Sequence, residues 1–401
     1  MRAADMRLLL EDVCSDIVRY LHANGRPDAF ASVDIDREWN LGILNAFADL
    51  RVKPADGREY LVEIKTGYTT LEVVEHLRRK YSASSTRLDR VARVVLVVAR
   101  ADHPDWSELE RRVRDAVRGS IAVEIWDDER INVLVGELFG VSLGSLSDEH
   151  DLVQVRAEIY RAKLRLGLGR VPTDPHELVL ADSLLWHLGF WRVRELSAAN
   201  ASGGLSSLVP ARHYEGVVAL FADLCSFSAF VRDTPHEEIV RSSLTAFYSR
   251  ARYQIINEGG MIYQFVGDEV TAFFGIPDQR DRYVEAALRT ALSLVEIARS
   301  VEDHWQRRID KLQVRSGIHV GMAMGDISLV AQRPFDVARL GAFGDTLNLA
   351  ARLRSNAGPD EIVISNVLKE SMPDGWDVDE HEPVEAHNVG LVRAWCLRRN
   401  G

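Results

Sequence analysis

Two acidic side chains at the ends of apolar segments are the residues of this sequence best suited to chemistry. Asp223 ends the apolar run 216–223, and Asp268 lies in a Gly-Asp turn between the runs Met261–Val266 and Val270–Phe274. Such runs are typical of strands, and the turn chemistry predicts a hairpin. Carboxylates offer the hard oxygen ligands that Mg²⁺ and Mn²⁺ prefer. The pattern predicts a divalent-metal site that could face a polyphosphate.

A third segment adds polar side chains on a predicted helix. The string Gly-Asp-Thr-Leu-Asn-Leu-Ala-Ala-Arg covers residues 344–352. Asn348 and Arg352 are four residues apart, so a helix would place them on one face. A guanidinium fits phosphate oxygens, which makes Arg352 a candidate for contact with a phosphate group. A solvated surface arginine is the ordinary alternative.

Together these three segments resemble the class III nucleotidyl cyclases, the adenylate and guanylate cyclase family, over about half the chain. The resemblance implies a reaction from a nucleoside triphosphate to its 3′,5′-cyclic monophosphate and diphosphate, with two divalent ions, Mn²⁺ or Mg²⁺. It implies that Asn348 orients the ribose and that Arg352 stabilises charge on the transferring phosphoryl group. The metal ligands that it implies are Asp223, Leu224 and Asp268.

The resemblance also implies a set of phosphate-binding groups. These are the main-chain amides of the loop after Asp223 and two arginines: Cys225, Ser226, Phe227, Arg315 and Arg393. The loop departs from the family pattern, since Ser226 stands where the family prefers Gly and Ser228 where it prefers Thr. A different loop conformation is therefore expected. For Arg393, a solvated charge on an edge strand is the alternative.

The positions that read the base depart from the adenylate cyclase pattern. Typical adenylate cyclases have Lys and Asp or Thr where this chain has Gln264 and Gly341. Strand alternation predicts that Gln264 still faces the pocket. An amide donates and accepts, so Gln264 could pair with uracil, guanine or, after a flip, cytosine. The amide alone does not choose between them.

Nearby bulky residues would favour a smaller base if they point inward: Tyr263, Phe265, Phe343 and Arg339. Core packing and surface charge are their ordinary alternatives. With the altered base-reading positions, the chain looks like the pyrimidine cyclases of the bacterial Pycsar antiphage systems. This resemblance ranks UTP first, giving cUMP, then CTP or GTP, with ATP last. It also implies a role in antiviral defence.

A single cyclase domain that contains both residue sets implies a homodimer with two sites, because in this family each site forms between two domains. Two other functions stay open. One is a pseudo-cyclase that binds nucleotide as a regulatory module. The other is a nuclease with an accessory nucleotide-binding half.

The N-terminal region has a second set of possible metal ligands. Asp49 is followed by Glu63-Ile64-Lys65 on the next predicted strand, which resembles the D…E-x-K spacing of the PD-(D/E)xK nuclease-like fold. Two carboxylates and a lysine could hold metal and activate water. Glu-x-Lys on a strand is also common on solvated faces. An active nuclease and a degenerate sensor of nucleic acid or a phage component are both open.

The element pattern predicts a mixed α/β (α+β) chain in three regions. Residues 1–145 form an α/β domain, 146–210 a helical linker region with a helix over Asp151–Leu166, and 211–401 a cyclase domain. The order β-α-β-β-α-β in the last region favours a ferredoxin-like core.

Bulk composition indicates a cytoplasmic protein. A net charge of −11 disfavours broad binding to nucleic acid or anionic membranes. The three cysteines have no metal-ligand spacing and fit a reducing compartment. The longest apolar run is too short to span a bilayer.

Overall fold

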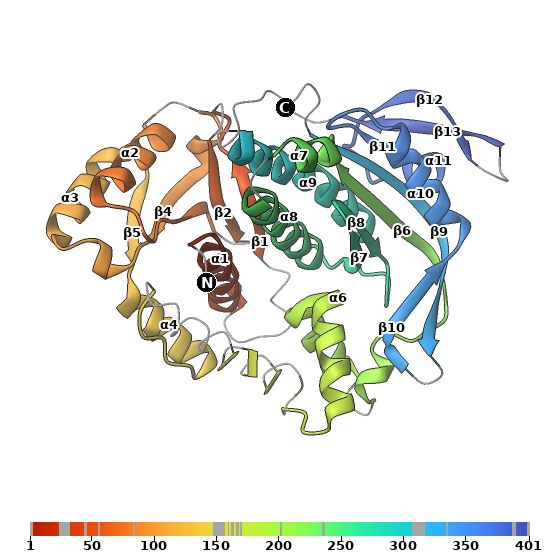
Figure 1. Ribbon diagram of the computed structural model, residues 1–401, viewed down its shortest axis with the longest axis horizontal. Helices are drawn as coiled ribbons and strands as arrows, with labels where there is room; N and C mark the ends of the chain where they lie inside the picture. Colours follow the sequence, from red (N-terminus) through yellow and green to blue (C-terminus); the bar gives the residue numbers. More distant parts are fainter. Residues whose placement is uncertain are drawn as a thin grey trace. The chain divides into compact units, whose positions relative to one another are not determined.

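The computed structural model divides into two compact units, Met1–Val171 and Pro172–Gly401 (Figure 1). No helix among its described residues is long and apolar enough to cross a membrane. The described residues are 3–23, 33–43, 46–54, 57–82, 85–146, 157–158, 160–161, 164–165, 168, 171–200, 203–234, 237–306, 317–333, 336–386 and 390–398.

The first unit is built on a five-stranded sheet with the order β1-β2-β3-β4-β5. Strands β1 to β3 form an antiparallel meander, and β4 and β5 continue the sheet in parallel. The strands are β1 (Val33–Asn40), β2 (Phe47–Pro54), β3 (Glu59–Ile64), β4 (Val91–Val97) and β5 (Ala122–Trp126). The helices are α1 (Ala3–Ala23), α2 (Thr70–Tyr81), α3 (Trp106–Ala116) and α4 (Asp128–Phe139), with 3₁₀ turns at Leu88–Arg90 and Arg100–Asp102.

Apolar packing joins this sheet to its helices. The residues of β4 from Val94 onward are buried, as expected for an inner strand of a parallel sheet. Val94 and Leu96 share one apolar cluster with Leu77 of α2 and Leu109 of α3. Helix α1 contacts β1, β2 and β3. Helix α2 begins at a capping box in which Thr69 and Glu72 satisfy each other's main-chain amides.

The second unit is built on a sheet with the order β12-β13-β11-β9-β6-β8-β7, and β10 pairs with β9. Its strands are β6 (His213–Leu224), β7 (Met261–Val266), β8 (Glu269–Phe274), β9 (Ile318–Arg333), β10 (Asp336–Phe343), β11 (Ile362–Ser365), β12 (Val378–Ala386) and β13 (Gly390–Leu397). Its helices are α6 (Pro175–Ala199), α7 (Phe227–Asp233), α8 (Glu237–Asn257), α9 (Tyr283–Gln306), α10 (Asp345–Asn356) and α11 (Asn366–Glu370), with a 3₁₀ turn at Leu205–Ser207.

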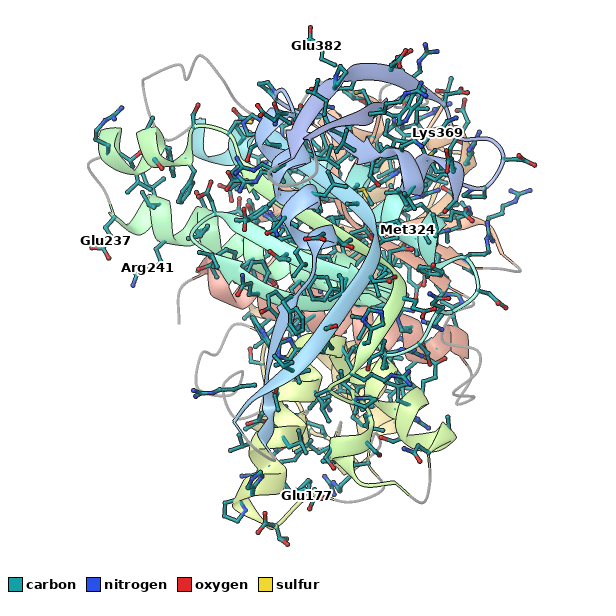
Figure 2. All side chains as sticks on the ribbon, turned by 90° about the vertical axis from the view of Figure 1, so that its right-hand side faces the viewer. Glu177, Glu237, Arg241, Met324, Lys369 and Glu382 are labelled. Atoms are coloured by element: carbon teal, nitrogen blue, oxygen red, sulfur yellow. The ribbon has the colours of Figure 1, made fainter. Side chains whose placement is uncertain are left out.

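The core of the second unit has the predicted ferredoxin-like element order. Elements β6, α8, β7, β8, α9 and β9 follow one another as β-α-β-β-α-β, apart from the short α7. In the sheet the same strands lie side by side as β9-β6-β8-β7, and each pair is antiparallel. Figure 2 shows the long β9 and β10 hairpin of this unit running past α6, which contacts β10.

Alternation along β6 decides which side chains meet α10. Val218, Leu220 and Ala222 join the apolar cluster that contains α8 and α9. Asp223 follows Ala222 and so lies on the opposite face, where α10 contacts β6 and β9. The helix approaches closely at Gly321 of β9, where a Cβ would lie 2.1 Å from the main-chain nitrogen of Arg354. Only glycine allows this approach.

Helix α6 lies within the 146–210 region in which the composition predicts a linker. The structure assigns Pro175–Ala199 to a helix of the second unit, where it contacts α8, β7 and β10. Its apolar side chains explain the difference, since Leu180, Leu184 and Leu188 are buried. Most of the predicted helix Asp151–Leu166 lies outside the described residues.

A sharp break at Gly189 shapes α6. This residue has φ 74° and ψ 167° inside the helix, and a Cβ there would lie 2.6 Å from Cδ1 of Ile256. Just before the break, Arg252 of α8 donates to the carbonyl oxygens of Leu185 at 2.6 Å and Trp186 at 3.1 Å. At the break, a side chain of α8 therefore provides hydrogen bonds to helix carbonyls.

Candidate functional site

Asp223 and Asp268 meet at one end of the β6, β7 and β8 strands. Asp223 is the penultimate residue of β6, and Asp268 lies in the turn between β7 and β8. A hydrogen bond joins the two carboxyl groups. Burial raises the pKa of Asp268 to about 7, and the adjacent Asp223 carboxylate adds to the rise. The structure thus brings the two predicted metal ligands together.

These residues fit a divalent cation. A divalent cation beside the pair would lower the raised pKa of Asp268, so that its carboxyl group ionises and can act as a ligand. Leu224 can contribute only its main chain, because its side chain is buried in the apolar core. Oxygen donors of this kind suit Mg²⁺ and Mn²⁺. The candidate ligand atoms at this site are therefore oxygens, and neither sulfur nor imidazole nitrogen is among them.

Arg354 and Glu269 also belong to this carboxylate cluster, and the sequence patterns did not identify them. Arg354 of α10 donates through Nη1 to Asp223 Oδ2 at 3.1 Å and through Nη2 to Glu269 Oε2 at 2.5 Å. Glu269 is the register partner of Asp223 across β6 and β8. Burial raises the pKa of Glu269, and Arg354 opposes that rise. The cluster thus contains three carboxyl groups and one guanidinium.

No contact described in the structure joins Asn348 or Arg352 to this carboxylate cluster. Both are exposed on α10, whereas Arg354, on another side of the same helix, reaches Asp223. Their shared face confirms the i, i+4 expectation, since both fall within Asp345–Asn356. Among the described contacts, the arginine that meets Asp223 is therefore not the one that the family motif indicates.

The loop after Asp223 differs from the expected phosphate-binding arrangement. The amide of Cys225 donates to Gly317 O at 2.9 Å, so in this conformation that amide already has a main-chain partner. Ser226 is exposed and has φ 56°, in the left-handed region that favours glycine. This explains why the family prefers Gly there. Phe227 begins α7, and its ring packs against Phe230.

A thiol and an imidazole meet behind this loop. Cys225 Sγ lies 3.2 Å from His319 Nε2, and His319 Nδ1 lies 2.7 Å from Ala357 O. The carbonyl can only accept, so Nδ1 carries the proton and Nε2 accepts from the thiol. Burial, followed by the Asp360 carboxylate, raises the pKa of Cys225 to about 12. The thiol stays protonated and holds the loop in place.

The two arginines expected at the triphosphate have different outcomes. Arg315 lies outside the described residues. Arg393 is exposed on β13, where it pairs with Glu380 at 3.2 Å and lies over the ring of Trp395. Strand β13 lies between β12 and β11, so in the alternative reading of Arg393 the edge strand is wrong, whereas the exposed charge is present. Arg393 has the contacts of a solvated surface charge.

The base-reading positions lie on two strands that touch. Gln264 is exposed on β7, just after a bulge at Tyr263. Gly341 pairs with Val330 in the hairpin of β10 and β9. Tyr263 Oη accepts a hydrogen bond from the amide of Ala342 at 3.0 Å, which ties the two strands together. The bulge and this bond hold both base-reading positions in one region.

The bulky neighbours do not all crowd this region. Phe265 packs against Tyr248 and Trp186, at centroid distances of 4.4 Å and 6.1 Å, so it faces α8 and α6. Phe343 is 57% exposed, and Arg339 is exposed as well. Arg339 and Phe343 belong to the same strand as Gly341, and Tyr263 bonds to that strand from β7.

The three N-terminal site residues converge in the first unit. Lys65 Nζ lies 3.1 Å from Asp49 Oδ2 and 2.6 Å from Glu63 Oε2. All three are buried, with at most 4% exposure. Lys80 of α2 also pairs with Glu63, at 2.8 Å, and Tyr81 donates to the same carboxylate. Cations of this chain therefore hold the carboxylates that a nuclease would use for metal.

Further charged groups close the same cluster. Arg7 of α1 pairs with Asp49 and lies 3.5 Å from Glu11 and 3.6 Å from Glu38. The carboxylate oxygens of Glu11, Glu38 and Asp49 lie within 4.8 Å of one another. Burial alone would raise the pKa of Asp49, but Arg7 and Lys65 outweigh it and hold that pKa well below its usual range. The cluster is a buried ion-pair network.

Removing the central cation of this network should destabilise the first unit. Lys65→Met leaves Asp49 and Glu63 buried with one partner fewer, and we expect a loss of about 3–5 kcal/mol in urea unfolding. The pKa of Asp49 is lower in the folded chain than in the unfolded chain, where it is about 4. Asp49 therefore stabilises the fold above about pH 4, and this stabilisation is lost as the pH falls below that value. The exposed pair of Arg112 and Glu108 provides the control, since Arg112→Met should cost under about 1 kcal/mol. Equal effects of the two variants would contradict the network.

Metal binding at Asp223 and Asp268 should stabilise the second unit. We expect saturating Mn²⁺, at about 100 times its Kd, to add about 2.7 kcal/mol to unfolding, seen as a higher melting temperature. Asp223→Asn should abolish most of that gain. Asp379→Asn, at an exposed ion pair with Arg398, is the matched control and should keep it. An undiminished gain in Asp223→Asn would place the metal elsewhere.

Comparison with known proteins assigns the C-terminal region. Residues 209–398 match the family described as "Adenylate and Guanylate cyclase catalytic domain". The chain is 29% identical over 194 residues to the receptor-type guanylate cyclase gcy-23 of Caenorhabditis elegans, covering 47% of this chain and 17% of that protein. It is 31% identical over 168 residues to the uncharacterized protein Rv2212 of Mycobacterium tuberculosis, covering 41% and 36%.

An adenylate cyclase of Mycobacterium tuberculosis is 24% identical over 184 residues, covering 46% of this chain and 40% of that protein. The chain thus spans less than half the length of these curated relatives. Among solved structures, the adenylyl cyclase CyaB from P. aeruginosa aligns with 19% identity and a TM-score of 0.43, over 47% of this chain and 96% of that one. The similarity to adenylate and guanylate cyclase catalytic domains thus lies in residues 209–398.

Proposed function

We propose that this chain is a nucleotidyl cyclase that converts a nucleoside triphosphate into its 3′,5′-cyclic monophosphate and diphosphate. The observation that carries the proposal is the paired carboxyl groups of Asp223 and Asp268, inside the region that matches the cyclase family. They and the main chain of Leu224 would hold two divalent ions, Mn²⁺ or Mg²⁺. When bound, such ions neutralise the polyphosphate and favour ionisation of the ribose hydroxyl.

The proposed reaction needs no covalent attachment to the protein. The ribose 3′-oxygen loses its proton to solvent and bonds to the α-phosphorus. The bond from that phosphorus to the bridging oxygen breaks, and diphosphate leaves. The chain has to align the two oxygens and neutralise charge, and the carboxylate pair is suited to that role.

A homodimer fits the positions of Asn348 and Arg352. Both are exposed on α10, and among the described contacts neither meets the carboxylates of its own chain. We infer that they act on the nucleotide held by Asp223 and Asp268 of a second copy, so that each dimer has two sites. Ser226, Phe227 and Arg315 are the groups that we propose at the triphosphate.

UTP is the substrate that we rank first, with cUMP as product. Gln264 is exposed on β7 and offers an amide, while Gly341 offers no side chain to accept from an adenine amino group. The relatives include proteins named guanylate cyclase and adenylate cyclase, so likeness to them does not select a base. CTP and GTP follow, with ATP last. A cytoplasmic role in antiphage defence rests on the resemblance to pyrimidine cyclases.

A nucleotide panel tests this function. We expect the full chain with Mn²⁺ to cyclise UTP fastest, with product identified by mass spectrometry. Arg352→Ala should lower kcat by about 100-fold or more, because it removes a donor that acts in the transition state. Mixing it with Asp223→Asn should restore part of the activity, since one site of the mixed dimer is then intact. Dominant cAMP would overturn the base assignment, and no turnover of any nucleotide would overturn the function.

We further propose that the first unit has a PD-(D/E)xK nuclease-like fold that serves as a sensor of nucleic acid or a phage component. Its support is the convergence of Asp49, Glu63 and Lys65 on strands of a sheet with the helix and strand order of that fold. The burial of all three argues against cleavage, because a phosphodiester must reach the carboxylates.

Plasmid DNA incubated with the chain and Mg²⁺ should stay intact. The reason is that Lys65, Lys80 and Arg7 already neutralise the buried carboxylates. Agarose electrophoresis over several hours provides the measurement. Cleavage by the wild-type chain that disappears in Lys65→Ala would show an active nuclease instead of a sensor.

A further inference from the structure

The carboxylate cluster of the second unit contains its own cation. Antiparallel register places Asp223 directly opposite Glu269, and Asp268 precedes Glu269 in the chain. Like charges directly opposite each other repel. Arg354 relieves this repulsion with one nitrogen on each carboxylate, Asp223 Oδ2 at 3.1 Å and Glu269 Oε2 at 2.5 Å. The guanidinium thus bridges two strands of the site.

Both ends of this bridge are partly withdrawn from water. The side chains of Arg354 and Asp223 are each 24% exposed and that of Glu269 is 18% exposed. Arg354 Nε is buried without a hydrogen-bond partner. The guanidinium therefore contacts the two carboxylates only through its terminal nitrogens, Nη1 and Nη2. The close contact between α10 and Gly321 fixes the main chain of Arg354 at this place.

A divalent ion at Asp223 has to contend with this guanidinium. Asp223 has two oxygens: Oδ2 accepts from Arg354, and the carboxyl group also bonds to Asp268. A divalent ion that binds Oδ2 would lie close to the positively charged guanidinium of Arg354. Two cations at such short range repel strongly. Glu269 gives Arg354 a second partner, so the side chain can leave Asp223 and remain paired.

We propose that Arg354 is a built-in counter-cation that occupies Asp223 in the substrate-free enzyme and yields Oδ2 to a divalent ion. This inference rests on the proposed cyclase function. Glu269 keeps the released guanidinium beside the site. The free chain therefore binds metal weakly, and the triphosphate, whose negative charge offsets Arg354, brings the metal with it. Arg354 is a positioning residue, because it acts through Asp223.

The test is Mn²⁺ binding by the full chain without nucleotide, measured by the electron paramagnetic resonance of the free ion. We expect Arg354→Gln to tighten binding by about tenfold, because a competing charge leaves the ligand. Arg398→Gln is the control: it removes the same charge from an exposed pair with Asp379 in the same unit, and should change binding less than about twofold. Arg354→Lys keeps the charge but not the two-pronged fork, and should tighten binding by a smaller factor.

Equal or weaker Mn²⁺ binding in Arg354→Gln, with an unfolding curve like that of the wild type, would overturn the inference and make Arg354 a static structural pair. A similar tightening in Arg398→Gln would overturn it too, since the loss of any one positive charge would then explain the effect. If Arg354→Gln does not fold, Arg354→Lys decides alone: binding equal to wild type refutes the inference. None of these outcomes depends on turnover, so failure of the nucleotide panel is distinguishable from failure here.

Discussion

Electrostatic repulsion between acidic groups at the ends of β6 and β8 is the constraint on which the second unit's site depends. The fold holds Asp223, Asp268 and Glu269 together although each would be more stable apart. The raised pKa of Asp268 and the Arg354 guanidinium reduce this repulsion. A divalent ion can therefore take over from Arg354 the neutralisation of the Asp223 carboxylate. The ferredoxin-like core supplies the rigidity, because α8 and α9 pack against the opposite face of β6.

Strand alternation and turn chemistry were sufficient to predict this core and the meeting of its two aspartates. Both depend on local pattern and on neighbouring strands, which the sequence shows directly. Arg354 could not be found that way, since it lies 131 residues from Asp223 and the sequence does not say which side of α10 faces the sheet. Gly321 decides that packing, and its effect is visible only when α10 lies on β9. The partner of the Cys225 amide, Gly317, directly precedes β9 and is remote in sequence, so local pattern did not reveal this hydrogen bond.

The first unit shows the same division between local and distant information. Asp49, Glu63 and Lys65 lie on adjacent strands, so their convergence followed from spacing. Lys80, Tyr81 and Arg7 come from helices, and only the packed structure brings them to the carboxylates. They change the chemistry of the cluster from metal binding toward internal ion pairing. An identical motif in sequence can therefore belong to an open catalytic site or to a closed structural network.

The most direct measurement is a crystal structure of the full chain with Mn²⁺ and a non-cyclisable UTP analogue, with the anomalous signal of manganese recorded. The account requires a manganese peak between the carboxylates of Asp223 and Asp268, with the triphosphate beside it and Asn348 and Arg352 supplied by a second copy. Manganese and nucleotide bound elsewhere, with Asp223 and Asp268 still sharing their hydrogen bond, would contradict it.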